Sequence, residues 1–237
     1  MKRNMQKYQG TEVLEVLEGA RNYNAWIASA IESHLIDPIL EIGSGIGNIS
    51  EYFLKRDLTV SDIDGALVER FRINHSKVKN IKFRTLDIEN EPRDVFRNSY
   101  KSIFAVNVLE HIEDDEKALK NMFRLLAKKG KLILLVPAKE KAYTDLDKKL
   151  GHFRRYEKND LRSKVVRAGF EIDELYFFNF VGLFSWIIRE KVDNSSGDLK
   201  PTHVAIFDKI VPVLRFIEKR SRPFLGISLI VVATKKS

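Results

Sequence analysis

The sequence predicts an α/β fold in which helices cover both faces of a mostly parallel sheet. Short apolar runs alternate with amphipathic segments along the chain, as strands and helices do in such folds. A glycine-rich turn directly follows the first apolar run, at residues 43–47. The chain has 237 residues, of which 44% are hydrophobic and 31% charged. This composition is ordinary for a globular protein, and the whole of residues 1–237 is expected to form a single domain.

Residues 1–37 are expected to form an N-terminal helical cap. Residues 1–20 are polar and weakly patterned, whereas apolar and aromatic side chains recur at helical spacing between residues 23 and 35. Pro38 then ends the pattern. Because this helix precedes the first strand, it could lie across the mouth of a ligand site. Packing of its aromatic side chains on the sheet is an equally good interpretation.

The first predicted strand, at residues 39–42, leads into Gly43, Gly45 and Gly47, and a helix is expected to begin at about Asn48. Glycine adopts positive φ angles easily and lets the backbone contact a ligand directly. A strand, a glycine-rich turn and a helix N-terminus together form the nucleotide-binding corner of a doubly wound sheet. A plain strand-to-helix connection would not need three glycines, so the pattern favours a ligand site.

The spacing of these glycines differs from that of the dinucleotide fingerprint. In that fingerprint the third glycine comes three residues after the second. Here it comes two residues after, Asn48 occupies the fingerprint position, and Glu41 stands two residues before Gly43. This pattern does not favour the binding of a pyrophosphate.

Acidic residues end the next two predicted strands. Asp62 follows a β-branched run 19 residues after Gly43, close to the spacing at which a carboxylate binds ribose hydroxyls. Asp64 is better placed to cap the helix expected at residues 65–75. Asp87 ends the strand at residues 80–88, where a turn aspartate is the alternative interpretation.

The rest of the chain completes the sheet. Strands are expected at residues 101–108 and 131–136, with a helix between them that Gly130 ends. A long polar loop at residues 138–155 and a helix at 157–168 follow. Two final strands, at 171–180 and 224–234, are joined by a helical insertion at residues 182–223. A polar loop at the carboxyl edge of a parallel sheet is a common place for substrate contacts.

The pattern Glu-x-Gly-x-Gly-x-Gly at residues 41–47 resembles motif I of the class I S-adenosylmethionine methyltransferases. Over residues 22–235 the chain is similar to a bacterial subgroup found beside, or fused to, family 2 glycosyltransferases. The resemblance rests on residues 22–26, 40–48, 107–115, 136–138, 150–156, 178–179 and 223–228. The element Gly-His-Phe-Arg-Arg-Tyr at residues 151–156 is the part most specific to the subgroup.

The resemblance implies a Rossmann-like class I methyltransferase fold with a seven-stranded, mostly parallel sheet and an antiparallel last strand. It implies S-adenosylmethionine as cofactor and S-adenosylhomocysteine as product, with Asp87 at the adenine amino group. The cofactor-binding residues expected from it are Tyr23, Trp26, Glu41, Gly43, Ser44, Gly45, Gly47, Asn48, Asp62, Ile63, Asp87, Ile88 and Asn107.

Two histidines are candidate catalytic residues. An alcohol or phenol acceptor needs a base of near-neutral pKa, which histidine provides. His111 follows the fourth strand and His152 lies in the polar loop, so both belong to the expected ligand edge. Structural roles for both remain open alternatives. Arg154 and Arg155 could bind an anionic group of the acceptor or brace the loop against Asp145 and Asp147.

Composition narrows the partners. The chain has no cysteine, and its five histidines show no local metal-ligand spacing, so no metal site is expected. The net charge of +8 is spread along the chain without an RNA-binding signature, so no nucleic-acid partner is expected. The first ten residues lack the apolar core of a secretory signal, which makes a cytoplasmic location the default expectation.

The sequence therefore predicts a methyltransferase that acts on a small-molecule, saccharide or lipid-linked acceptor, with O-methylation favoured. A protein that binds the cofactor without transferring a methyl group is one alternative, and a nucleic-acid or protein methyltransferase is another. The insertion at 182–223 combines apolar and basic residues. It could be a lid, a subunit interface or a peripheral contact with the inner face of a membrane.

Overall fold

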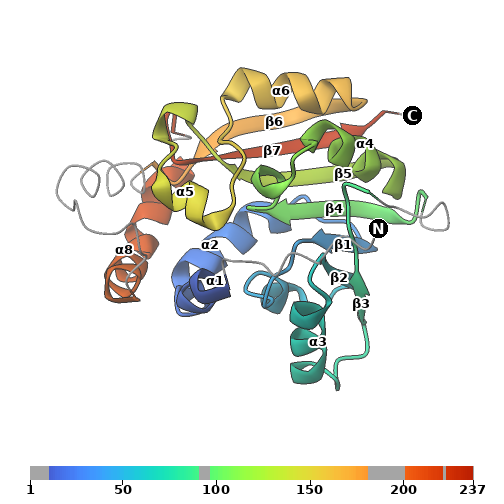
Figure 1. Cartoon of the computed structure of the whole chain (residues 1–237), viewed down its shortest axis with the longest axis horizontal. Coiled ribbons are helices and arrows are strands. Elements are labelled where there is room, and N and C mark those ends of the chain that lie inside the picture. Colours follow the sequence, from blue (N-terminus) through green and yellow to red (C-terminus); the bar gives the residue numbers. More distant parts are fainter. Residues whose placement is uncertain (1–10, 91–96, 181–200, 221–222, 237) are drawn as a thin grey trace.

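The computed structural model describes residues 11–90, 97–180, 201–220 and 223–236. Within these residues the strands form one seven-stranded sheet in the order β3-β2-β1-β4-β5-β7-β6 (Figure 1). β7 is antiparallel to both β5 and β6, and the other neighbours pair in parallel. The predicted fold class is therefore confirmed. The strands are β1 (Ile39–Ile42), β2 (Leu58–Asp62), β3 (Ile81–Thr85), β4 (Tyr100–Val106), β5 (Leu126–Pro137), β6 (Phe170–Phe178) and β7 (Ser228–Lys235).

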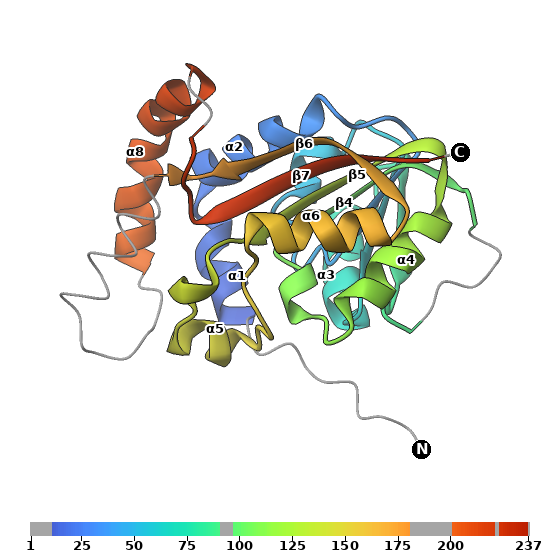
Figure 2. The same cartoon turned by 90° about the horizontal axis from the view of Figure 1, so that it is seen from above.

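Helices lie on both faces of the sheet. The α-helices are α1 (Thr11–Glu18), α2 (Arg21–Glu32), α3 (Gly65–Asn74), α4 (Asp115–Leu125), α5 (Asp145–Leu150), α6 (Lys158–Arg167) and α8 (Pro201–Arg220). Short 3-10 helices are η1 (Ser50–Phe53), η3 (Leu109–His111) and η4 (Glu140–Ala142). Figure 2 shows α4 and α6 on one side of the sheet and α2 and α8 on the other.

The core consists of two buried layers, one on each face of the sheet. Successive side chains of a strand point to opposite faces. In β5, for example, Leu132 and Leu134 pack with α4 and α6, whereas Ile133 and Leu135 pack with α2 and α8. Strands covered on both faces read as continuous apolar runs, which explains why these segments are recognisable in the sequence.

Three local expectations were wrong. Gly130 does not end α4, because α4 ends at Leu125 and Gly130 lies within β5. Instead of a helix from Asn48, the chain forms the 3-10 helix η1 from Ser50, because Gly47 has φ of +94° and still belongs to the turn. The segment 138–155 is not one long loop, since it contains η4 and α5. A capping box between Thr144 and Asp147 begins α5, and the left-handed Gly151 ends it.

Of the predicted insertion at 182–223, the structure describes α8 and residue 223, and the remainder lies outside the described residues. α8 packs against α2 through Asp208, whose carboxylate accepts hydrogen bonds from the backbone amides of Asn22 and Tyr23. Among the helices of the described ranges, none is both long enough and apolar enough to cross a bilayer.

Candidate functional site

A cavity of about 360 Å³ opens at the carboxyl ends of the parallel strands. This edge is where ligands bind in open α/β sheets, next to the point at which the strand order reverses between β1 and β4. Figure 1 shows α1 and α5 at the end of the sheet toward which β4 points. The cavity is lined by α1, α2, the glycine turn, the segments after β2, β3 and β4, and residues 150 and 152.

The glycine turn could not be built from larger residues. Gly43 has φ of +70°, and a Cβ there would lie 2.4 Å from Cγ2 of Val108. A Cβ on Gly47 would lie 2.2 Å from the Phe71 ring. Gly43, Ser44 and Gly45 line the cavity, whereas Gly47 does not. Gly47 instead allows the turn to pack on α3, so its role is in packing and not in contact with the cavity.

Glu41 and Ser44 place polar groups on the cavity wall. The buried Glu41 carboxylate accepts a hydrogen bond from the Ser50 hydroxyl. Burial raises the pKa of Glu41 to about 8, the Ser50 hydrogen bond opposes this rise, and the charge of Asp62 adds to it. The buried Ser44 hydroxyl has no hydrogen-bond partner within the described part of the chain. A bound ligand would satisfy it.

The two acidic residues at the end of β2 have different places, and the predicted cap of α3 by Asp64 is confirmed. Asp62 is buried and lines the cavity, with one carboxylate oxygen 2.8 Å from the Gly45 amide and the other 2.9 Å from the Asp64 amide. It therefore fixes the glycine turn against β2. Asp64 caps α3 by accepting from the Ala66 amide and does not line the cavity. Ile63 is exposed at the same rim of the cavity.

After β3, Asp87 and Ile88 line the cavity beside Ile63. The Asp87 carboxylate accepts hydrogen bonds from the backbone amides of Glu89 and Asn90, at 3.0 and 3.1 Å. Asp87 therefore shapes the turn, as one of the two interpretations held, and it also lines the cavity, where its contact with adenine stays a prediction.

The remaining predicted cofactor residues do not all reach the cavity. Tyr23, Asn48 and Asn107 line it. Trp26 does not, because its ring is buried in the core, with its centroid 4.4 Å from that of the Phe178 ring. The expectation that Trp26 binds the cofactor was therefore wrong, and Trp26 is a core residue. The aromatic pattern in α2 could not distinguish Tyr23 from Trp26, since both belong to the inward-facing half of the helix.

Three polar side chains gather at the far end of the cavity, namely Glu110 and His111 from η3 and His152 from the segment after α5. The two imidazole rings meet edge to face, with centroids 4.6 Å apart. Burial raises the pKa of Glu110 to about 8. Burial and the neighbouring His152 together lower the pKa of His111 to about 4. His111 is therefore neutral at physiological pH.

Asp147 orients His152. The Asp147 carboxylate lies 2.7 Å from Nδ1 of His152, so Nε2 is the nitrogen left for the cavity. Arg155 donates to both carboxylate oxygens, at 2.9 and 3.0 Å, and the Thr144 amide and hydroxyl donate to one of them. Burial alone would raise the pKa of Asp147, but the hydrogen bonds from His152 and Arg155 outweigh it and hold this pKa well below its usual range. Asp147 is therefore ionised.

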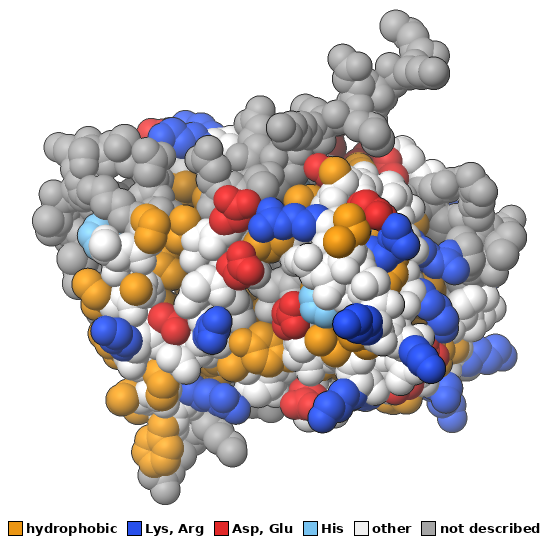
Figure 3. Space-filling model, turned by 90° about the horizontal axis from the view of Figure 1, so that it is seen from below, with side chains coloured by type: hydrophobic (Ala, Val, Ile, Leu, Met, Phe, Trp, Pro, Cys, Tyr) orange, Lys and Arg blue, Asp and Glu red, His pale blue; other side chains and the backbone are white. Residues whose placement is uncertain are grey.

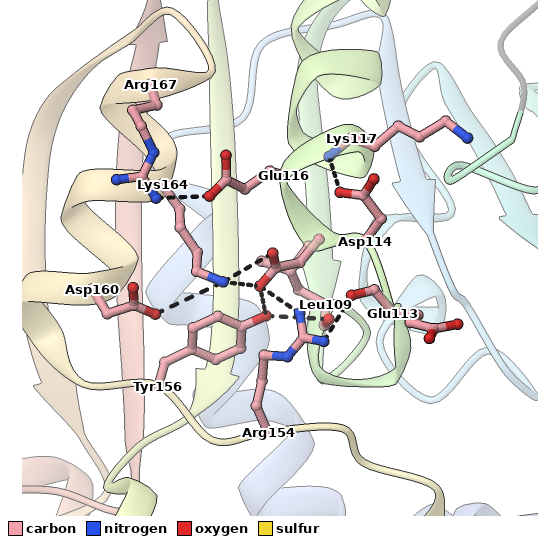
Figure 4. A network of polar contacts seen from close by, with 11 residues as sticks. Leu109, Glu113, Asp114, Glu116, Lys117, Arg154, Tyr156, Asp160, Lys164 and Arg167 are labelled. Carbon is pink, nitrogen blue, oxygen red and sulfur yellow. Dashed lines mark hydrogen bonds and ion pairs between the residues drawn. The ribbon is translucent and has the colours of Figure 1, made fainter.

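A second buried network holds this segment against the sheet (Figure 4). The Tyr156 hydroxyl donates to Asp115 at 2.9 Å and lies 3.2 Å from the Leu109 carbonyl. Arg154 pairs with Asp115 at 2.8 Å, and Lys164 from α6 pairs with it at 2.7 Å. Arg154 and Arg155 therefore both brace the structure, as one of the two predicted alternatives held, although Arg154 pairs with Asp115 and not with Asp145 or Asp147.

A family model described as a methyltransferase domain matches residues 4–175. The chain belongs to this methyltransferase family. Its cofactor is S-adenosylmethionine.

Solved structures of methyltransferases share the fold. A methyltransferase of Thermotoga maritima, described as a possible histamine N-methyltransferase, has a TM-score of 0.63 at 19% identity, and the match covers 95% of each chain. Phosphoethanolamine N-methyltransferase 2 of Haemonchus contortus, solved with S-adenosylmethionine, has a TM-score of 0.61 at 16% identity. That match covers 91% of this chain and 53% of the other.

Among curated proteins, clavatol synthase claF of Penicillium crustosum is 29% identical over 115 residues. The match covers 45% of this methyltransferase chain and 4% of the synthase. The chain thus corresponds to a small part of the much longer curated relatives that it matches.

The residues of the cavity fit the methyltransferase cofactor. The backbone of the glycine turn is open to the cavity, the Ser44 hydroxyl there has no partner in the described ranges, and Asp62 and Asp87 bring carboxylates to the same wall. Ile63 and Ile88 offer apolar surface to a flat base. These residues would hold the adenosine and amino acid parts of the cofactor.

Sequence reasoning missed two contributions to this methyltransferase site. Val13, Leu14 and Leu17 of α1 line the cavity, and the Leu14 carbonyl accepts a hydrogen bond from the Asn48 side chain. Their helical spacing within the polar N-terminal segment was the available signal. Glu110 was also missed, although a carboxylate beside a candidate histidine directly after a strand could have indicated it.

Proposed function

We propose that this protein transfers the methyl group of S-adenosylmethionine to an oxygen atom of a small-molecule, saccharide or lipid-linked acceptor. The observation that carries the proposal is a cavity with two chemically different ends. One end is the glycine turn with its carboxylates, and the other is the cluster of Glu110, His111 and His152. The bound cofactor supplies an electrophilic methyl group on a sulfonium, and the protein aligns the acceptor behind it.

We assign the activation of the acceptor hydroxyl to His152. Its Nδ1 is held by Asp147, so its Nε2 is oriented toward the cavity in the way that an aspartate orients a catalytic imidazole. His111, with its low pKa, is a weaker base and a better hydrogen-bond acceptor. In the reaction the hydroxyl loses its proton and an oxygen–carbon bond forms while the carbon–sulfur bond breaks. The bonding electron pair goes to sulfur and gives S-adenosylhomocysteine.

The acceptor that we favour is a saccharide or lipid-linked precursor at the inner face of a membrane. One support is the similarity of residues 150–156 and 223–228 to methyltransferases found beside family 2 glycosyltransferases. The other is α8, which carries exposed apolar side chains along one face, at Ile206, Ile210, Val213 and Ile217, each 47% exposed or more. Phe216 and Phe224 extend this apolar stripe. Figure 3 shows hydrophobic side chains at the lower left, over α8.

The charges next to the apolar stripe suit an anionic lipid surface. Lys209 and Arg215 are exposed on α8, and the whole chain carries a net charge of +8. On the face drawn in Figure 3, basic and acidic side chains are interspersed and form no single basic patch. This distribution supports a surface contact through α8 in preference to a nucleic-acid partner.

Flotation with anionic liposomes tests the membrane contact. The wild-type chain is expected to float at low and moderate salt, and Ile210→Ser is expected to reduce the bound fraction. Val166→Ser is the matched control, because Val166 is an equally exposed aliphatic residue on α6. If the wild-type chain does not float, or if both variants lose the same bound fraction, α8 does not contact the membrane.

Two measurements test the activity. Isothermal titration is expected to show binding of S-adenosylmethionine and S-adenosylhomocysteine but not of NAD. Transfer of a labelled methyl group to a panel of alcohol, phenol and amine acceptors is expected for the alcohols. The rate should fall in His152→Ala and stay unchanged in His203→Ala, a surface variant on α8. Cofactor binding without transfer to any acceptor would favour a binding protein, and NAD binding without S-adenosylmethionine binding would refute the proposal.

A further inference from the structure

The polar end of the cavity has the composition of a metal site. Glu110, His111 and His152 each present one ligand atom, and these atoms all lie within 4.8 Å of one another. Metal–ligand distances of about 2.0–2.2 Å allow two ligands of the same ion to lie up to roughly 4.4 Å apart. Small side-chain rotations would therefore bring the three atoms onto one ion.

Glu110 supplies an independent indication that something binds here. Its side chain is completely buried, and neither carboxylate oxygen has a hydrogen-bond partner within the described residues. Buried polar groups are nearly always paired, so such a group calls for a ligand that completes its interactions. The nearest cation, Arg155, is already engaged by Asp147 through Nε and Nη2. Apart from its own backbone amide, which lowers the pKa of Glu110, the carboxylate meets no hydrogen-bond donor within the described residues.

Both imidazoles are held from behind in the manner of metal ligands. Nδ1 of His152 is bonded to the Asp147 carboxylate, and the ring of His111 interacts with the backbone carbonyls of Leu150 and Gly151. Ligating histidines typically donate their second ring nitrogen to a carboxylate or a carbonyl, which fixes the ring orientation. For His152 this leaves Nε2 as the ring nitrogen oriented toward the cavity.

We propose that Glu110, His111 and His152 bind a divalent transition-metal cation that activates the acceptor hydroxyl. Two imidazoles and one carboxylate suit zinc, cobalt or iron and leave coordination positions open for water or substrate. A cation at this position lowers the pKa of a bound hydroxyl, so the alkoxide can form at neutral pH. With the ion bound, His152 would act as a ligand in place of its role as base, and the proton of the hydroxyl on the ion would pass to solvent water. This role in the reaction rests on the proposed methyl transfer, whereas the metal site itself does not.

Titration of chelator-treated, tag-free protein with Co²⁺ tests the proposal. One equivalent is expected to bind with visible absorption bands typical of nitrogen and oxygen ligands in a low-coordinate site. Zn²⁺ is expected to displace it, with an affinity in the micromolar range or tighter by isothermal titration. Glu110→Gln and His152→Ala should each weaken the affinity at least tenfold, and Asp147→Asn should weaken it by about tenfold or more through the orientation of His152.

The matched control is His203→Ala, which removes an exposed histidine on α8 and should bind the ion as the wild-type chain does. If the wild-type chain shows no Co²⁺ spectrum at one equivalent, the proposal is overturned. This result does not depend on whether any variant folds. Equal affinities in wild type and Glu110→Gln overturn it as well. Because S-adenosylmethionine binding is measured separately, normal cofactor binding without metal binding would reject the metal site and leave the proposed function standing.

Discussion

Replacement of Asp115 by alanine is expected to destabilise the fold strongly, because this carboxylate is the centre of the buried network in Figure 4. Asp115 begins α4 and is 3% exposed. It accepts a hydrogen bond from Tyr156 and pairs with Arg154 and Lys164, at 2.8 and 2.7 Å. These contacts join α4 to α6 and to the segment that carries His152. The variant would leave two cations close together without their counter-charge.

The expected loss follows from burial. Breaking a buried ion pair by removing one partner costs about 3–5 kcal/mol, because the other charge stays buried. The neighbouring Glu116 provides a matched control. It pairs with Arg167 at 2.7 Å, but its side chain is 37% exposed and that of Arg167 is 53% exposed. Pairs of this kind contribute about 0–1 kcal/mol. Asp115→Ala should therefore lower the free energy of unfolding by several kcal/mol more than Glu116→Ala does.

Urea unfolding followed by circular dichroism measures this difference, provided that the m-values of the variants match. The pH dependence adds a second check. Burial raises the pKa of Asp115, but the hydrogen bonds from Lys164, Arg154 and Tyr156 outweigh it, so the net pKa is lowered. The stabilisation is thus complete above the unfolded pKa of about 3.9 and is lost as pH falls below it. A loss in Asp115→Ala within 1 kcal/mol of that in Glu116→Ala, on the order of measurement error, would refute the reasoning.

Three further predictions concern the cofactor end. Asp62→Ala should weaken S-adenosylmethionine binding by about tenfold to a hundredfold in isothermal titration. Asp64→Ala removes only a helix cap and should weaken binding less. Equal affinities of the two variants would contradict the assignment of Asp62 to the cofactor ribose. Gly47→Ala should lose several kcal/mol of unfolding free energy, because the new Cβ would lie 2.2 Å from the Phe71 ring. Gly151 has φ of +77° and nothing within 4 Å of an added Cβ, so Gly151→Ala should lose only about 1–2 kcal/mol. Burial raises the pKa of Glu41 to about 8. Affinity for the cationic cofactor should therefore rise with pH up to about 8 and then level off, and Glu41→Gln should abolish this dependence. A flat pH profile of the wild-type affinity would contradict a contact between Glu41 and the cofactor.

The sequence alone determined the parts of this protein that depend on local physics. Strands buried on both faces must be apolar throughout, so the positions of the central strands could be predicted. The number of seven strands followed from the family resemblance. The turn after β1 needs residues that tolerate positive φ, which made Gly43 recognisable. The different roles of Asp62 and Asp64 also followed from position, since one ends a strand and the other precedes a helix.

Only the tertiary structure decided which side chains meet. Trp26 and Tyr23 belong to the same helix pattern, and only the packing against Phe178 places one in the core and the other at the cavity. The expectation of no metal site rested on local spacing. Glu110 and His152 are far apart in the sequence, and they converge because the amide of Phe153 donates to the Glu110 carbonyl at 2.8 Å and docks the segment after α5 onto the end of β4. Contacts of this kind depend on how strands and loops pack across the sheet. A local sequence pattern does not predict this packing.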